Sequence, residues 1–231
     1  MIMKLIQLKQ VLDNKRFLLF TIFIPVAWYV FLYNIQQGIT PNLMLGIAVF
    51  IGIIGNSLAT FSKRISSNID FYSFESKFSK YTVKNYLLDQ TLVQLVLNTL
   101  IFIVVLAVGI LFFSFPLNSQ LVVQFFLLTI MGIYFSIIGF VIGVRLDEKI
   151  IDTVSFPVII LASMTIIPFA SLGAEGGFME FISKAQMIFP GYYYTNIVNA
   201  LTTSTNIDVK DVALFLSLIH ISEPTRRTPI S

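Results

Sequence analysis

Five long apolar stretches, each free of ionisable side chains, constrain this chain more than any other feature. A helix needs about 20 apolar residues to cross a hydrocarbon core roughly 30 Å thick. The stretches cover residues 17–33, 43–61, 92–113, 121–144 and 154–172, and none contains Asp, Glu, Lys, Arg or His. The pattern therefore predicts an all-α, polytopic membrane protein with five visible transmembrane helices.

The composition agrees with a bilayer environment. Hydrophobic residues make up 56% of the 231 residues and charged residues only 12%, which is more apolar surface than one soluble core of this size can hide. The sequence has no cysteine, which excludes disulfides, thiolate catalysis and cysteine metal sites. The first apolar stretch is too long for a cleaved signal, and no small-residue cleavage site follows it.

Lysine and arginine gather on one side of the predicted membrane domain. They precede the first stretch, recur through residues 62–90 and flank the turn between the fourth and fifth stretches. The opposite side has only Lys184 and Lys210. Because positively charged loops stay in the cytoplasm, we expect a cytoplasmic N-terminus. A sixth span is expected to start after Asp211 and to return the chain to the cytoplasm.

Residues 216–231 resemble an in-frame translation of a transposase adapter used in short-read library preparation. Scars of this kind are excluded from reasoning about the fold. We therefore expect residues 1–215 to form an incomplete membrane domain that lacks its sixth span, and residues 216–231 to be a non-native tail. His220 is the one histidine of the sequence, and it lies in this tail, so it receives no functional role.

Two cytoplasmic segments carry amphipathic patterns. Residues 1–16 place Ile2, Leu5 and Leu12 at helical spacing with lysines on the remaining face, which predicts a helix lying in the membrane interface. A frayed extension of the first span fits the same residues. Residues 62–90 mix basic residues with aromatic ones at helical spacing, and an apolar face on a cytoplasmic loop needs a cover. That cover is either the membrane surface or a soluble partner.

Small and polar residues mark the faces where the spans meet. The fourth stretch has Gly132, Ser136, Gly139 and Gly143 along one face, which predicts a tight helix contact within the chain or across a dimer. The second stretch carries Asn56 and Ser57, and the third carries Thr91, Gln94 and Asn98. Such side chains face protein or a water-filled path, so interhelical hydrogen bonds and a substrate path both remain open.

Missing motifs narrow the function further. Ion-coupled transporters and proton pumps usually need an ionisable group within the membrane, and no stretch has one. The sequence has no G-x-x-x-x-G-K-[ST] loop, metal-ligand cluster, catalytic constellation or nucleic-acid patch. The acidic residues Asp147, Glu148 and Asp152 lie beside Arg145 and Lys149, and we interpret them as a solvated turn. Energy for uphill transport would have to come from another polypeptide.

This organisation resembles the type-2 family of ABC transporter permeases, in its short bacterial form. The resemblance covers residues 1–215 and rests on the interfacial helix, the long basic loop, the short external loops and a proline-broken region after the fifth stretch. It implies a non-catalytic permease subunit of an ATP-driven exporter in the bacterial plasma membrane. The expected partners are ATP-binding subunits, which hold the ATP and Mg²⁺, and a second permease copy or paralogue. No cofactor, metal or nucleic acid is expected on this chain.

The resemblance also implies roles for individual residues. The family's coupling helix, which docks on the ATP-binding subunit, corresponds to residues 63–84, although the family's glycine and proline are missing here. Candidate coupling residues are Lys63, Arg64, Phe71, Phe74, Glu75 and Phe78. Candidate residues of the substrate path are Asn56, Ser57 and Pro168.

The external region after the fifth stretch is expected to form a broken, partly re-entrant pair of short helices. Pro168 and the glycines Gly173, Gly176 and Gly177 interrupt a regular helix, and residues 178–189 are apolar enough to dip into the interface. The tyrosines at 192–194 would anchor the region there. An ordinary external amphipathic loop is the alternative. For the whole chain, the alternative function is a membrane scaffold or immunity protein that moves nothing.

Overall fold

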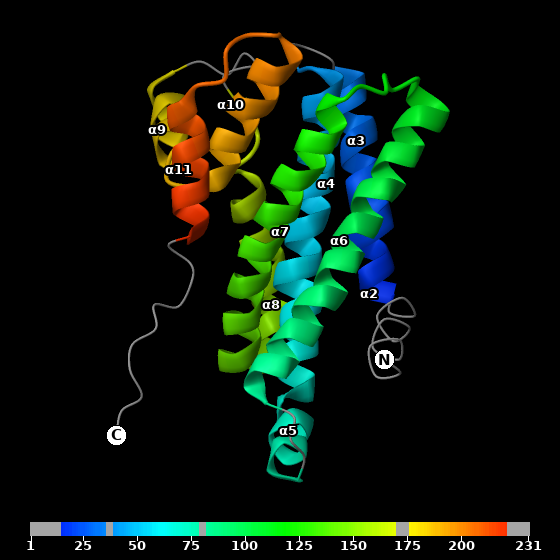
Figure 1. Ribbon diagram of the computed structural model, residues 1–231, viewed down its shortest axis with the longest axis vertical. Helices are drawn as coiled ribbons and strands as arrows, with labels where there is room; N and C mark the ends of the chain where they lie inside the picture. The colour runs from blue at the N-terminus through cyan, green and yellow to red at the C-terminus, as the bar shows by residue number, and fades with distance from the viewer. Residues whose placement is uncertain (1–14, 36–38, 79–81, 170–175, 221–231) are drawn as a thin grey trace.

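The computed structural model describes residues 15–35, 39–78, 82–169 and 176–220. All regular structure in these ranges is helical. The predicted interfacial helix over residues 1–16 lies outside them, except for its last two residues. Figure 1 shows a bundle of long helices with α5 projecting from one end and α9 and α10 at the other.

The first helix is one continuous rod with a widened turn. It consists of α2 (Lys15–Leu18), a π-helical segment η1 (Leu19–Phe23) and α3 (Ile24–Ile35). In the π-helical turn the Ile24 N–H bonds the carbonyl of Leu19, five residues back. Pro25 follows immediately and has no N–H to offer the preceding turn, so this stretch could not be a uniform α-helix.

The central helix is the longest element and is enclosed by the others. It joins α4 (Pro41–Gly55), the π-helical segment η2 (Asn56–Phe61) and α5 (Ser62–Phe78) without a break. Every side chain from Asn42 to Ser62 is buried. A helix that is apolar on all sides needs neighbours on all sides. The helices α3, α6, α7, α8 and α10 contact α4, and Figure 1 shows several of them around it.

Three helical stretches of the described residues are long and apolar enough to cross a membrane: Pro41–Ile69, Leu88–Phe113 and Gln120–Arg145. The last two belong to α6 (Val83–Phe113) and α7 (Gln120–Arg145). Ile24–Ile35 is a shorter apolar helix. The chain is accordingly a helical, membrane-associated protein, with three such helices where the sequence predicted five.

Two helix boundaries differ from the sequence prediction. No turn follows Phe61, because residues 62–78 contain neither glycine nor proline and the helix runs on to Phe78. The fifth predicted span is α8 (Glu148–Ser163), which includes Pro157 and ends well before residue 172. Its end is fixed by Gln186, whose side-chain amide donates to the carbonyls of Met164 at 2.6 Å and Ile167 at 2.9 Å.

Three short helices follow: α9 (Gly177–Gln186), α10 (Pro190–Thr202) and α11 (Val209–His220). The tyrosines of α10 do not form an exposed anchor. Tyr193 and Tyr194 are buried within the protein, and the Tyr193 hydroxyl donates to the Met187 carbonyl at 2.8 Å. Helix α11 begins at Val209, passes Phe215, which is fully buried, and ends at His220.

The small-residue face of α7 lies directly on the central helix. A methyl group added at Gly139 would overlap the Ser57 carbonyl oxygen, and one added at Gly143 would overlap the Ser62 carbonyl and lie 2.7 Å from the Ile65 Cβ. A methyl group at Gly132 would likewise strike the Asn98 amide of α6. The backbones of α7 and the central helix can therefore approach this closely only without side chains at these positions.

Replacing Gly139 with alanine tests this contact. Because the added methyl group meets backbone and not a movable side-chain end, we expect Gly139→Ala to lower the free energy of unfolding by about 1–3 kcal/mol. Thermal unfolding in detergent, followed through the fluorescence of Trp28, the one tryptophan, reports the loss. Gly177→Ala is the matched control, since nothing lies within 4 Å of its added methyl group. Equal unfolding temperatures for both variants would contradict the contact.

Candidate functional site

A buried polar cluster joins the central helix to α6 and α7. The Asn56 amide donates to the Asn98 carbonyl oxygen at 3.2 Å, and the Gln94 amide reaches both Ser57 Oγ at 3.3 Å and Asn98 Oδ1 at 3.4 Å. Ser57 and Ser136 place their hydroxyls 3.4 Å apart. Polar groups in an apolar bundle are costly unless they bond one another, so this cluster fixes how the three helices meet.

The candidate substrate-path residues do not share one surface. Asn56 and Ser57 are 0% exposed and belong to the polar cluster. Pro168 is partly exposed and lies beyond the end of α8, next to the Ile167 carbonyl that binds Gln186. Within this conformation, no solvent reaches the first two positions.

The first residues of α5 contact the segment between α7 and α8 and the first turns of α8. The Lys63 ammonium lies 2.8 Å from Asp152 Oδ2 and 3.7 Å from Glu148 Oε2, and the Ser66 hydroxyl donates to the Leu146 carbonyl at 2.9 Å. Glu148 and Asp152 keep 45% and 34% of their side-chain area exposed, so the interpretation as a solvated turn overlooked only their pairing with Lys63. Their partner was missed because it lies 89 positions away from Asp152 in the chain.

The candidate coupling residues divide into two groups. The Arg64 guanidinium is not on the surface: it lies 5.1 Å from the centre of the Phe61 ring, and its three nitrogens are buried. Phe74 is 64% exposed on the part of α5 that leaves the bundle (Figure 1). Phe71, Glu75 and Phe78 also belong to α5, but their side chains lie outside the described part of the structure.

A second polar cluster joins α4, α7 and α10 at the end of the bundle opposite α5. The Gln124 amide of α7 donates to the Tyr194 hydroxyl at 2.8 Å and to the Asn42 carbonyl at 2.6 Å, and Asn42 and Asn118 exchange side-chain hydrogen bonds at 3.2 and 3.1 Å. The Tyr194 ring also covers Gly46, where a methyl group would overlap its hydroxyl. Sequence reasoning did not single out Gln124, although a lone amide within an apolar span was a usable signal.

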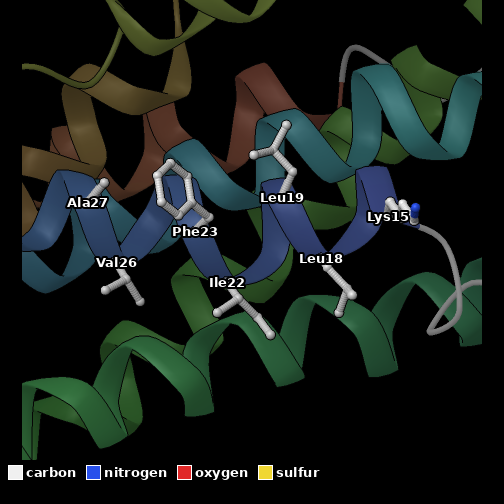
Figure 2. Close-up of a pocket in the computed structure, with 7 residues that line it drawn as sticks. All are labelled: Lys15, Leu18, Leu19, Ile22, Phe23, Val26 and Ala27. Atoms are coloured by element: carbon white, nitrogen blue, oxygen red, sulfur yellow. The ribbon is translucent and has the colours of Figure 1, made fainter.

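An apolar groove follows the first helix. Figure 2 shows its lining, with the Leu18 and Ile22 side chains directed towards α6. The groove has a volume of about 570 Å³ and is lined by Lys15, Leu18, Leu19, Ile22, Phe23, Val26 and Ala27. Apart from Lys15 at one end, this lining is apolar and suits hydrocarbon. Among the described residues, no group of three or more His, Asp or Glu residues could hold a metal ion.

Removing the amide of Asn98 tests the polar cluster. Asn98→Ala strands the Asn56 amide in an apolar interior and leaves the Gln94 amide its bond to Ser57, and we expect the unfolding free energy to fall by about 1–3 kcal/mol. The exposed Asn34, which bonds only the Val30 carbonyl of its own helix, provides the control Asn34→Ala, with a change within about 0.5 kcal/mol. Chemical denaturation in detergent micelles measures both. If the cluster does not stabilise the fold, Asn98→Ala will have the same free energy of unfolding as the Asn34→Ala control.

No known family model matches this chain, and neither a curated protein nor a solved structure matches it.

Proposed function

We propose that the chain is the membrane-spanning permease subunit of an ATP-driven exporter, coupled to a separate cytoplasmic ATP-binding subunit. The continuity of the central helix carries this proposal. The helix Pro41–Phe78 is fully buried through its core section and then leaves the bundle as α5, which presents the exposed Phe74. A partner that moves the end of α5 would thereby move the most enclosed helix of the molecule.

The contacts made by the first residues of α5 would transmit a movement of α5 to other helices as well. Lys63 holds Asp152 of α8, and Ser66 holds the carbonyl of Leu146 between α7 and α8. Displacing α5 therefore pulls on α8 as well, and the close contact at Gly139 and Gly143 passes the displacement to α7. No catalytic residue of this chain is involved: ATP and Mg²⁺ would be held by the partner, whose hydrolysis cycle supplies the force.

The proposed membrane arrangement goes beyond the three long apolar helices. It adds the first helix, Lys15 to Ile35, and α8 as crossing or partly crossing elements, with α9 and α10 re-entering from the outside. The support is exposed apolar side chains on these helices, which water would not solvate: Phe23 at 67%, Phe156 at 65% and Phe181 at 68%. The basic loops favour a cytoplasmic N-terminus in a bacterial plasma membrane.

Export would follow a path between two permease copies, identical or paralogous. In the conformation described, Asn56 and Ser57 are sealed by Gln94 and Asn98. They would line a path only after the central helix and α6 separate. The two polar faces would then be exposed together, which is how a sealed cluster of uncharged polar groups could serve alternating access.

The sealed polar cluster also supports a second candidate, a membrane scaffold or immunity protein that transports nothing. Such a protein needs a rigid core and no opening, and its α5 would lie on lipid without an ATP-binding partner. The two functions differ in what binds α5.

A charge placed on α5 separates them. We expect Phe74→Asp to abolish co-purification of an ATP-binding subunit and its stimulated ATP hydrolysis, because the carboxylate would be desolvated in an apolar contact. Leu117→Asp is the control, since Leu117 is similarly exposed, at 69%, in the loop between α6 and α7 at the opposite end. An ATPase that binds both variants equally, or that never binds the unaltered chain, would favour the scaffold.

A further inference from the structure

The polar cluster continues towards the cytoplasmic end of the bundle as a line of buried polar side chains. On α6 the residues Gln94, Gln90 and Tyr86 follow one another at intervals of one helical turn. Gln94 bonds Ser57 of the antiparallel central helix, so the next turns place Gln90 level with Thr60, and Tyr86 level with Arg64. The electrostatic interaction between Arg64 and Tyr86 agrees with this register.

This line ends in polar atoms that the protein leaves unsatisfied. The Nε and both Nη atoms of Arg64 are buried without a hydrogen-bond partner, and so are Thr60 Oγ1 and Gln90 Oε1. Thr60 and Gln90 are 5% and 2% exposed. An unpaired buried hydroxyl or amide is already costly, and a buried guanidinium without an anion costs far more. Such a group requires a partner that the described residues do not supply.

None of the described side chains accepts a hydrogen bond from the Arg64 guanidinium. The Phe61 ring gives Arg64 a cation–π contact, which offers the cation some attraction but accepts none of its five N–H bonds. Two acidic groups at this end, Glu148 and Asp152, lie against the ammonium of Lys63. Lys63 therefore has acidic partners, whereas the described residues give the Arg64 guanidinium none.

We propose that Arg64 and Thr60 form a binding site for an oxyanion of the phosphate class. The planar guanidinium matches two phosphate oxygens with parallel N–H bonds, and the Thr60 hydroxyl, one helical turn away, can donate to the same group. Arg64 lies near the end of the apolar stretch Pro41–Ile69, and a helix that crosses a membrane brings the ends of its apolar stretch close to the lipid phosphates. As a residue, Arg64 is only partly buried, so a swing of its side chain towards the membrane surface opens the site.

The phosphate could come from an anionic phospholipid or from solution, and the test distinguishes these sources. Thermal unfolding of the full chain is measured in nanodiscs of neutral phosphatidylcholine, with and without phosphatidylglycerol. It is also measured in detergent with inorganic phosphate, against chloride at equal ionic strength. We expect one of these anions to raise the unfolding temperature by about 3–6 °C at a tenfold excess over its dissociation constant.

Two variants assign the effect to Arg64. Arg64→Met removes the charge at similar length and should lose the anion-dependent shift, while Lys149→Met, an exposed position at the same end with the same loss of charge, should keep it. Arg64→Lys should retain part of the shift, because a single ammonium lacks the two parallel donors. A shift with phosphatidylglycerol alone identifies a lipid ligand, and a shift with inorganic phosphate identifies a free one.

The proposal is overturned if neither anion stabilises the unaltered chain, or if Arg64→Met keeps the shift. The first comparison needs no variant, so the test stands even where Arg64→Met does not fold. Loss of ATPase binding by Phe74→Asp leaves this result unchanged, which separates the anion site from the proposed transport function.

Discussion

The burial of the central helix on every side is the constraint on which the other contacts depend. An apolar helix with no solvent face requires neighbours all around it, and the closest of them, α7, reaches it only because Gly139 and Gly143 carry no side chain. Within that enclosure the polar side chains have no water to bond. The side chains around Asn56 and Asn98 therefore bond one another across three helices, and these bonds set the helices' relative positions.

The two ends of the central helix make different contacts with the rest of the molecule. At the end opposite α5, where the central helix begins at Pro41, Gln124 and Tyr194 tie α4, α7 and α10 together. At the other end it runs out of the bundle as α5, with Lys63 as a lateral tie to α8. One end of the central helix is thus held by hydrogen bonds to its neighbours, whereas the other end extends beyond the bundle as α5. This difference, more than any single residue, supports the proposal that force enters at α5.

The sequence predicted the helical class, the apolar stretches and the small-residue face of α7, because each rests on local spacing. It placed the end of the second helix at Phe61, since hydropathy falls there, yet hydropathy does not break a helix and no glycine or proline follows. The partners of Lys63 and the burial of Arg64 depend on contacts between distant segments, which spacing within one segment cannot reveal. For the same reason the tyrosines at 192–194 were expected to anchor the region in the membrane interface, whereas Tyr193 and Tyr194 are buried within the protein.

Cysteine accessibility tests the central claim most directly, namely that α5 and the loop between α6 and α7 lie on opposite sides of a membrane. The sequence has no cysteine, so Phe74→Cys and Ser119→Cys each introduce a single reactive thiol at an exposed position. A membrane-impermeant maleimide applied to intact cells should label Cys at 119 and should label Cys at 74 only after permeabilisation. Labelling of both thiols from the same side would contradict the account.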